Sequence, residues 1–344
     1  MKKGFIILLI LGLSLMGLKA GAQNNHLVMF YNVENLFDTI PSPNVLDHEF
    51  TPTGAKKWNG IKYWKKIANI EEVFYKIATQ ERTYPVIIGV SEIENRNVLE
   101  DIVAAPKLAK ANYQIVHYDS PDARGVDVAL LYRPDVFKYE GSYPIKLKMD
   151  ELPGLRTRDI LSVWGTIESQ PFCFFVCHLP SRLGGQAASE FRRVAGTQII
   201  KEAVDSIRLE RPDTRFVIMG DMNDNPTDKS LAQTLNAKRD ASKLAAGDLF
   251  NPFAAMLRDG LGTNAYQDAW SLFDNIITSE NLINAPQGGL KLVKKKKYYG
   301  YIFNKPFLIE SSGQYKGYPL RTFTGDNFKN GYSDHFPVYI LLSK

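Results

Sequence analysis

The chain has little cysteine. Its 344 residues include two cysteines, Cys173 and Cys177, which lie four positions apart in an apolar run that is typical of a β-strand. Roughly 13 Å would separate them at ~3.3 Å per residue, whereas a disulfide needs Cα atoms within about 7 Å of each other. We therefore expect two buried thiols, no disulfide, and a core stabilised by packing alone.

Apolar runs long enough to cross a membrane are also missing. The longest, residues 5–18, follows two lysines and precedes Ala20-Gly21-Ala22, which is the layout of a secretory signal peptide. The run is short for a spanning helix, and no cysteine lies near the cleavage site to carry a lipid. We expect residues 1–22 to be a signal peptide. Residues 23–344 would then be a periplasmic or extracellular protein with no stable membrane anchor.

The mature chain would have little excess of charge. Removal of residues 1–22 takes away three lysines and no acid, so the formal net charge falls from +5 to +2. This balance neither favours nor excludes nucleic acid as a partner, and any basic footprint must be local. The clearest basic tract is Lys294–Lys297, which we interpret as a solvated loop. Contact with nucleic acid, through these lysines and the tyrosines that follow, is the alternative.

Short and long apolar patterns are mixed along the whole chain, with no linker between them. Three longer stretches have helical spacing: 61–80, 97–109 and 188–210. Short β-branched runs predict strands at 26–33, 85–90, 113–118, 126–132, 160–167, 172–177, 215–220, 273–278 and 336–342. The pattern predicts a single α/β domain with more than one sheet.

Polar side chains gather where these strands end or begin. Ligand clefts in α/β proteins commonly lie beyond the strand ends. Each residue alone has a structural interpretation, as a turn former, a helix cap or a core histidine. Independent turns need not supply carboxylates, amides and imidazoles together, so the joint pattern favours a functional site. Its members are Asn32, Glu92, His178, Asp221, Asn223, Asp274, Asp334 and His335.

This set of side chains favours a hard cation and phosphate-ester hydrolysis. Carboxylate and amide oxygens are the ligands that Mg²⁺ or Mn²⁺ prefers, and the five histidines lack the spacing typical of zinc sites. Attack of water on a phosphoryl group needs a cation to neutralise the phosphoryl oxygens, an acid/base group to handle the water, and a positive charge to stabilise the transition state. A divalent cation, an acid and two histidines can supply these. A serine triad is excluded for Ser333-Asp334-His335, because neighbouring strand residues point to opposite faces.

The order of motifs resembles the endonuclease/exonuclease/phosphatase superfamily, which has the DNase-I-like fold. The motifs are FYNVENLFD, GVSEIEN, RGVDVALLYR, CHLPSRLGG, IMGDMND, DNIIT and GYSDHFPV, from about Leu27 to Ile340. CHLPSRLGG and LRTRDI are similar to a secreted bacterial branch. The resemblance implies a four-layer α/β sandwich of two mixed β-sheets flanked by helices, and divalent-metal-dependent cleavage of phosphoester bonds.

The resemblance also implies roles for the site residues. The residues that would hold Mg²⁺ or Mn²⁺ are Glu92, Asn32 and Asp334. Those that would act on the phosphate and water are His178, Asp221, Asn223, Asp274 and His335, with Asp274 orienting His335. Glu94 is an alternative to Glu92, which we prefer because it follows the apolar run directly. Glu34 has no role by this comparison.

Arginines near these motifs are candidates for gripping phosphate oxygens bidentately. Arg182 and Arg124 are the first candidates, and Arg156 and Arg158 are weaker ones. The sequence thus predicts an exported monomeric phosphodiesterase or endonuclease that acts on nucleic acid. The alternative is hydrolysis of a small phosphoester or a phospholipid head group. A non-catalytic binding module is the least favoured, because every catalytic position is filled.

Overall fold

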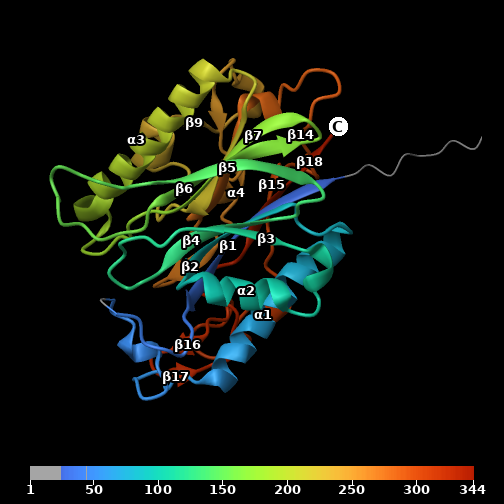
Figure 1. Cartoon of the computed structure of the whole chain (residues 1–344). Helices are drawn as coiled ribbons and strands as arrows, with labels where there is room; N and C mark the ends of the chain where they lie inside the picture. Colours follow the sequence, from blue (N-terminus) through green and yellow to red (C-terminus); the bar gives the residue numbers. More distant parts are fainter. Residues whose placement is uncertain (1–24, 44) are drawn as a thin grey trace, which may run out of the picture.

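The structure, a computed structural model, describes residues 25–43 and 45–344. It consists of two mixed β-sheets packed face to face with helices on their outer faces (Figure 1). The predicted fold, a four-layer sandwich, is therefore confirmed. The predicted signal peptide lies outside the described residues. Within them, no helix combines the length and apolar character needed to cross a membrane.

The first sheet contains the two ends of the folded chain side by side. Its central strand β1 pairs in parallel with β2 and antiparallel with β18. In order across the sheet, the strands are β14 (Lys291–Leu292), β18 (Val338–Ser343), β1 (His26–Leu36), β2 (Ile87–Ile93), β4 (Asp127–Tyr132) and β3 (Gln114–His117), with β15 (Gly300–Ile302) also paired to β18.

The second sheet is built from the middle of the chain. Its order is β5 (Phe137–Ile145), β6 (Ile160–Ile167), β7 (Gln170–His178), β8 (Arg215–Asp221), β13 (Asp274–Ser279), β10 (Leu249–Phe250) and β9 (Ala237–Lys238). Two small hairpins are separate from both sheets: β11 (Asn264–Tyr266) with β12 (Ala269–Ser271), and β16 (Phe323–Thr324) with β17 (Asn327–Phe328).

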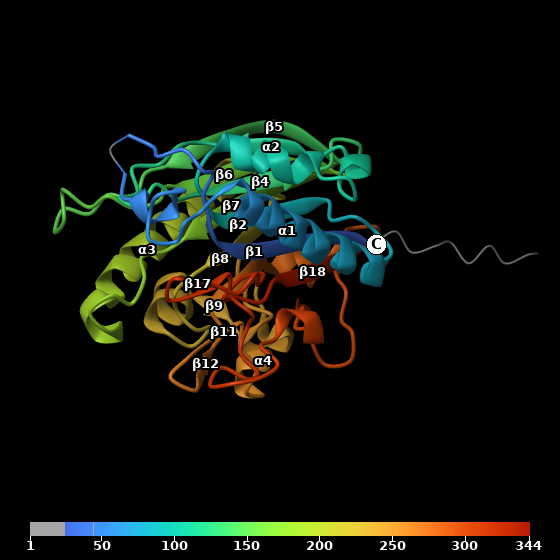
Figure 2. The same ribbon diagram turned by 90° about the horizontal axis from the view of Figure 1, so that it is seen from below.

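Helices cover the outer face of each sheet. The first sheet is covered by α1 (Gly60–Glu81) and α2 (Arg96–Ala104), and the second by α3 (Gln186–Glu210) (Figures 1 and 2). The short α4 (Ala254–Arg258) follows β10. Single helical turns lie at His48–Phe50, Ala109–Ala111, Ser230–Thr234, Ala241–Lys243, Glu280–Leu282 and Pro306–Leu308.

Strand alternation divides the core into three layers, because successive side chains point to opposite faces of a sheet. In β1, Val28 and Phe30 pack between the sheets, whereas Leu27 and Met29 pack under α1. The two sheets approach closely at Gly89 in β2, where an added Cβ would lie 2.5 Å from the Met219 sulfur. Their separation is therefore set by a position that carries no side chain.

The predicted elements are largely confirmed. Each of the nine predicted strands coincides with an observed one, and the three predicted helices are α1, α2 and α3. Cys173 and Cys177 are buried and free, as expected. In the first turns of α1 the apolar residues Ile61 and Trp64 are 71% and 55% exposed, so the buried face of the helix starts at Tyr63. The sequence pattern also missed β5, whose middle residues are polar and exposed.

Candidate active site

Four polar side chains extend the inner faces of the two sheets at one end of the sandwich. Asn32 continues the face of β1 that carries Val28 and Phe30. In the second sheet, Asp221 is the register partner of His178 in β7 and of Asp274 in β13. Three adjacent strands therefore bring their polar ends together opposite Asn32.

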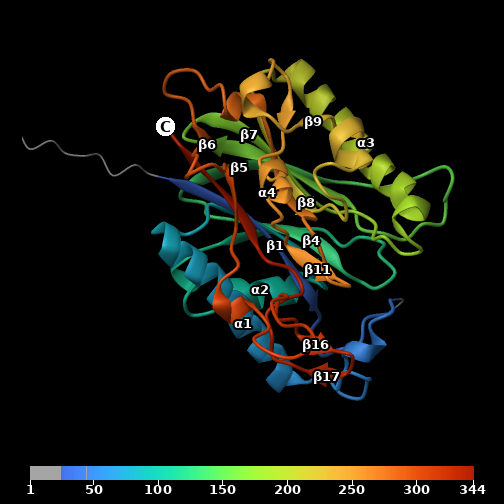
Figure 3. The ribbon, with the colours of Figure 1, turned by 180° about the vertical axis from the view of Figure 1, so that it is seen from behind.

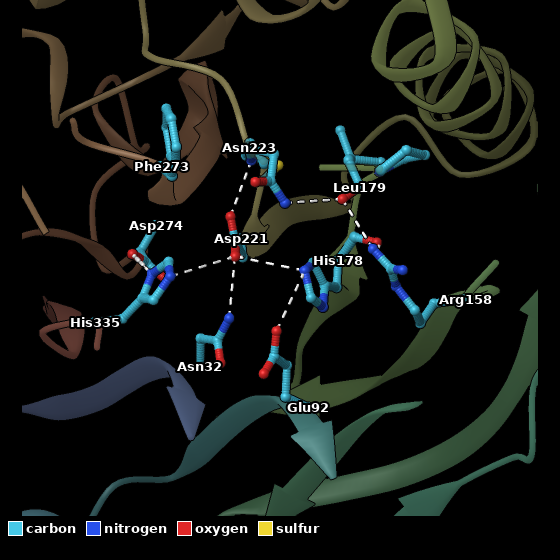
Figure 4. A network of polar contacts seen from close by, with 12 residues as sticks. Asn32, Glu92, Arg158, His178, Leu179, Asp221, Asn223, Phe273, Asp274 and His335 are labelled. Atoms are coloured by element: carbon cyan, nitrogen blue, oxygen red, sulfur yellow. Dashed lines mark hydrogen bonds and ion pairs between the residues drawn. The ribbon is translucent and has the colours of Figure 1, made fainter. Parts of the chain in front are cut away.

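The Asp221 carboxylate lies at the centre of this group (Figure 4). Asn32 Nδ2 donates a hydrogen bond of 3.0 Å to Asp221 Oδ2. The same oxygen lies 3.5 Å from His178 Nε2 and 3.8 Å from His335 Nε2. Asp221 Oδ1 accepts from the backbone N–H of Asn223 at 2.9 Å. One buried carboxylate thus contacts groups from both sheets.

The two histidines around Asp221 differ in charge. Burial disfavours the charged form of His335, but the carboxylates of Asp274 and Asp221 outweigh it and raise the pKa of His335 well above its usual value. His335 Nδ1 and Asp274 Oδ2 are 2.7 Å apart. At His178, burial and the nearby Arg158 hold the pKa well below its usual value. The site therefore pairs an imidazolium with a neutral imidazole.

The backbone carbonyls of His178 and Leu179 are fixed by a buried arginine. Arg158 Nε donates to the carbonyl of His178 at 3.1 Å, and Nη2 donates to the carbonyl of Leu179 at 3.0 Å. Its Nη1 donates to Asp122 at 2.9 Å. The structure does not favour the prediction that Arg158 grips phosphate, because each of its three nitrogens already has a partner inside the protein. Arg156 donates from Nε to the Pro121 carbonyl at 3.2 Å.

Glu92 reaches the site through a β-bulge. Regular alternation would place it with Val90 on the helix-covered face, but the pairing of β2 shifts register between Ser91 and Ile93. Glu92 itself has φ 62°, which is the left-handed region. The bulge turns the carboxylate inward, so that Glu92 Oε1 lies 3.9 Å from His178 Nε2.

Glu94, the alternative to Glu92, points elsewhere. Its oxygens accept from the backbone N–H of Asp38 at 2.6 Å and from the Ser42 hydroxyl at 2.7 Å. Burial, with Asp38 and Asp47 nearby, raises the pKa of Glu94 to about 7. Glu94 therefore anchors the segment after β1, and Glu92 is the glutamate that faces His178.

The oxygen atoms near Glu92 fit a hard divalent cation. Glu92 Oε2 accepts from the Asn35 backbone N–H at 2.9 Å, while Oε1 has the Arg124 guanidinium at 3.6 Å. Asn32 Oδ1 accepts from the Glu34 N–H at 3.0 Å and has a second lone pair. Asp221, Asp274 and His335 also lie close enough to share an ion. In this second group, however, both ring nitrogens of His335 face carboxylates, Nδ1 facing Asp274 and Nε2 facing Asp221. This arrangement suits proton transfer better than metal binding.

Asp334 belongs to a neighbouring ion-pair group. Its Oδ2 accepts from Arg321 Nη2 at 2.6 Å, and Arg321 Nε donates to Glu34 Oε1 at 3.2 Å. The buried ammonium of Lys66 in α1 completes this group, since its pKa responds to Glu34, Asp334 and Glu92. The carboxylate of Asp334, for which a metal role was predicted, thus forms an arginine salt bridge in this structure.

Sequence reasoning missed three members of that group: Glu34, Lys66 and Arg321. One signal was available, because Lys66 interrupts the buried stripe of α1 between Tyr63 and Ile70. Arg321 lies in a long loop without periodicity, so no sequence pattern could have found it.

The two arginines predicted to bind substrate have different surroundings. Arg182 Nε donates to the Asn223 carbonyl at 2.8 Å, and its Nη2 lies 3.1 Å from Asp224 and 2.6 Å from Asp228. It fixes the loop that holds Asn223, whose Nδ2 in turn donates to the Leu179 carbonyl. Arg124 is 42% exposed beside Glu92, so it is the one with room to meet a phosphate.

Comparison with known proteins agrees with this architecture. No curated protein matches the sequence closely. Similar solved structures include D. rerio TDP2 complexed with single-strand DNA product, at 13% identity and TM-score 0.54, covering 93% of this chain and 99% of that one. The human Nocturnin catalytic domain with bound sulfate covers 93% and 94%, at 17% identity and TM-score 0.53. The Bacteroides thetaiotaomicron mannosyl-6-phosphatase covers 93% and 100%, at 16% identity and TM-score 0.52.

These structural similarities show the fold alone, and the sequence identifies the family. Residues 27–344 match the Endonuclease/Exonuclease/phosphatase family, whose range covers the strands, helices and polar cluster described above. The chain therefore belongs to the Endonuclease/Exonuclease/phosphatase family of phosphoester hydrolases.

Proposed function

We propose that this protein is an exported, divalent-metal-dependent phosphoester hydrolase whose chemistry centres on Asp221. One observation carries the proposal: the buried Asp221 carboxylate lies within 4 Å of Nε2 of both His178 and His335. The surroundings lower the pKa of His178 and raise the pKa of His335. Two imidazoles held in opposite charge states around one acid suit proton transfer and stabilisation of a phosphoryl group.

The residues have separable roles in this proposal. Asp221, oriented by the Asn223 N–H and by Asn32, positions or deprotonates the attacking water. His335, held by Asp274, carries positive charge that stabilises the pentavalent phosphorus and can protonate the leaving oxygen. The neutral His178 can donate a hydrogen bond from Nε2, which faces the site, to a phosphoryl oxygen. Its ring orientation follows from the backbone that Arg158 fixes.

Glu92 and Asn32 are the residues that would hold Mg²⁺ or Mn²⁺, with Asp334 on the same side. A bound cation would neutralise negative charge on the phosphoryl oxygens. Their oxygen-rich surroundings support this ligand set.

The proposed substrate remains a phosphodiester of nucleic acid or a small phosphoester. A nucleic acid substrate is proposed from the sequence. This chain shares its fold with a TDP2 that was solved with a DNA product, which is consistent with such a substrate. A small phosphoester is supported by the position of the lysine run. Lys291 pairs with Ser343, at the far end of β18 from Asp334 and His335, so Lys294–Lys297 lies away from the site. Lys295 and Lys297 are also ion-paired, to Glu81 and Asp259.

Export and a monomeric state complete the proposal. The layout of residues 1–22 supports export, and N-terminal sequencing of the mature protein should then begin at Gln23. Size-exclusion chromatography with light scattering tests the monomer.

Metal-dependent hydrolysis is the decisive test. We expect hydrolysis of bis-aryl phosphate, plasmid DNA or a phosphomonoester with Mg²⁺ or Mn²⁺, and none in EDTA. Glu92→Ala and His335→Ala should each lower kcat/KM by about 10³-fold or more, since each removes a charge from the reacting centre. Glu94→Ala is the matched control for Glu92→Ala, because Glu94 points away from the cleft. Full activity in either site variant with intact folding would sink the assignment.

A further inference from the structure

A cavity adjoins the site at Asp334 and has no role in the chemistry described above. It has a volume of about 280 Å³ and lies between the β11–β12 hairpin and the loop of residues 310–324. Asp334 and Arg321 form its inner wall. Figure 2 shows the orange hairpin beside the red C-terminal segment. A phosphate held at His335 would thus have one of its substituents directed toward this cavity.

Aromatic rings form the outer part of the cavity. Tyr266 and Tyr315 line it and are 74% and 43% exposed, although burial would stabilise such large rings. Behind them, Tyr318 packs against Trp270, and Trp270 stacks on Phe336, the residue after His335. Tyr315, Tyr318, Trp270 and Phe336 therefore form a connected series of rings that ends at the residue following His335 in the chain.

The cavity has a built shape. The Tyr318 hydroxyl donates to Asp268 Oδ1 at 2.6 Å and accepts from the Asp268 backbone N–H at the same distance. This pair of hydrogen bonds joins the tip of the hairpin to the loop opposite. The two walls are thus held at a fixed separation.

The charge of the lining is negative. Three carboxylates line the cavity, Asp268, Glu310 and Asp334, against one lining cation, Arg321, while Lys329 pairs with Glu310 from outside the lining. That guanidinium already pairs with Asp334 and Glu34. A second phosphate, as in a nucleic acid strand, would be repelled here. Carboxylates and the amides of Gln267 and Gln314 are instead suited to bind hydroxyl groups.

We propose that this cavity binds an uncharged, polyhydroxylated ring that is esterified to the reacting phosphate, which makes the protein a sugar-phosphate or cyclic-polyol-phosphate hydrolase. The proposal rests on the proposed phosphoester hydrolysis and names its substrate class. The tyrosine faces stack on the C–H face of the ring, and the carboxylates and amides bind its hydroxyls. The cavity volume of about 280 Å³ is sufficient for one such ring.

Phosphate release from a panel of monoesters, together with strand cleavage of an oligonucleotide, tests the proposal. The probes are hexose 6-phosphates, ethyl phosphate, which has neither ring nor free hydroxyl, a nucleoside 5′-monophosphate and a single-stranded oligonucleotide. We expect kcat/KM for a hexose 6-phosphate to exceed that for ethyl phosphate by at least 100-fold. The double variant Tyr266→Ala/Gln314→Ala should lower the former at least tenfold and change the latter less than twofold. Tyr143→Ala, an exposed tyrosine of β5, is the matched control.

Other outcomes overturn the proposal. A preference for the nucleotide or the oligonucleotide would assign this series of rings to bases. An equal loss for both monoesters in the double variant would show that the cavity does not select the ring.

Inactivity toward every probe would refute the proposed hydrolase activity, but it would leave open the proposal that the cavity binds a polyhydroxylated ring. Calorimetric titration with a hexose 6-phosphate then tests the cavity directly. Saturable binding to the wild type that is lost in the double variant supports it, and no saturable binding to the wild type overturns it.

Discussion

His178 and His335 both direct Nε2 at Asp221, from 3.5 and 3.8 Å. Both rings are buried, so their charges differ because of the charged groups near each ring. Asp274 faces Nδ1 of His335, whereas arginines surround His178, whose Nδ1 has no hydrogen-bond partner. The sequence predicted both histidines and Asp274. It could not predict Arg158 as the support of His178, because that contact joins residues 20 positions apart through backbone carbonyls.

The charge of His335 should appear in the pH profile. Asp274→Asn removes the carboxylate that favours the imidazolium, so the pKa of His335 should fall. If protonated His335 is the active form, the alkaline limb of kcat/KM must then move to lower pH. A pH–rate profile measures the shift, and Asp119→Asn, an exposed acid outside the site, is the control. An alkaline limb that stays in place would remove His335 as its source.

At the scale of elements, side-chain patterns predicted where strands and helices lie. They did not predict irregularities within a strand or which distant segment a helix contacts. The runs in β1, β2 and β8 were clear because both faces of each strand are buried. The bulge at Glu92 was not predictable, since Ser91 and Ile93 give no turn signal. Nor was the contact of α1 with the C-terminal segment, where Lys66 Nζ donates to Thr322 Oγ1 and the Tyr332 carbonyl (Figure 3).

Lys66 should be essential to the stability of that contact. Lys66→Met leaves the oxygens of Thr322 and Tyr332 without their donor and Glu34 with less positive charge nearby, so it should cost about 1–3 kcal/mol of unfolding free energy. Glu34→Gln in the same chain should recover part of the loss, because it removes a buried negative charge that would otherwise have Arg321 alone as its nearby cation. Urea unfolding of the two single variants and the double variant gives the coupling energy. Additive losses would mean that the two residues do not stabilise each other.

For the whole molecule, the proposed catalytic group forms only where the two sheets meet. Asn32 and Glu92 come from the first sheet, and His178, Asp221 and Asp274 from the second. The order of motifs indicated this architecture through its resemblance to a family. The pairing order of the strands, and the cavity beside Asp334, depend on long-range contacts that no local pattern encodes.

The separation of the sheets should therefore control both stability and activity. Gly89→Val would press a side chain against Met219 and Phe30, and overpacking of this kind costs about 1–3 kcal/mol. Because Asn32 and Asp221 face each other across the same gap, kcat should fall as well. Thermal unfolding and steady-state kinetics measure the two effects. Gly154→Val, where an added Cβ meets no neighbouring atom, is the control and should change neither.

The bulge at Glu92 also has a consequence for engineering this protein. A left-handed backbone costs a glutamate of the order of 1–2 kcal/mol, which a glycine there would not incur. The backbone at this position therefore favours a residue that has no carboxylate. A screen of position 92 for thermal stability alone should select glycine, and the proposed cation would then lose its first ligand. Stability and hydrolysis thus make opposite demands on one residue.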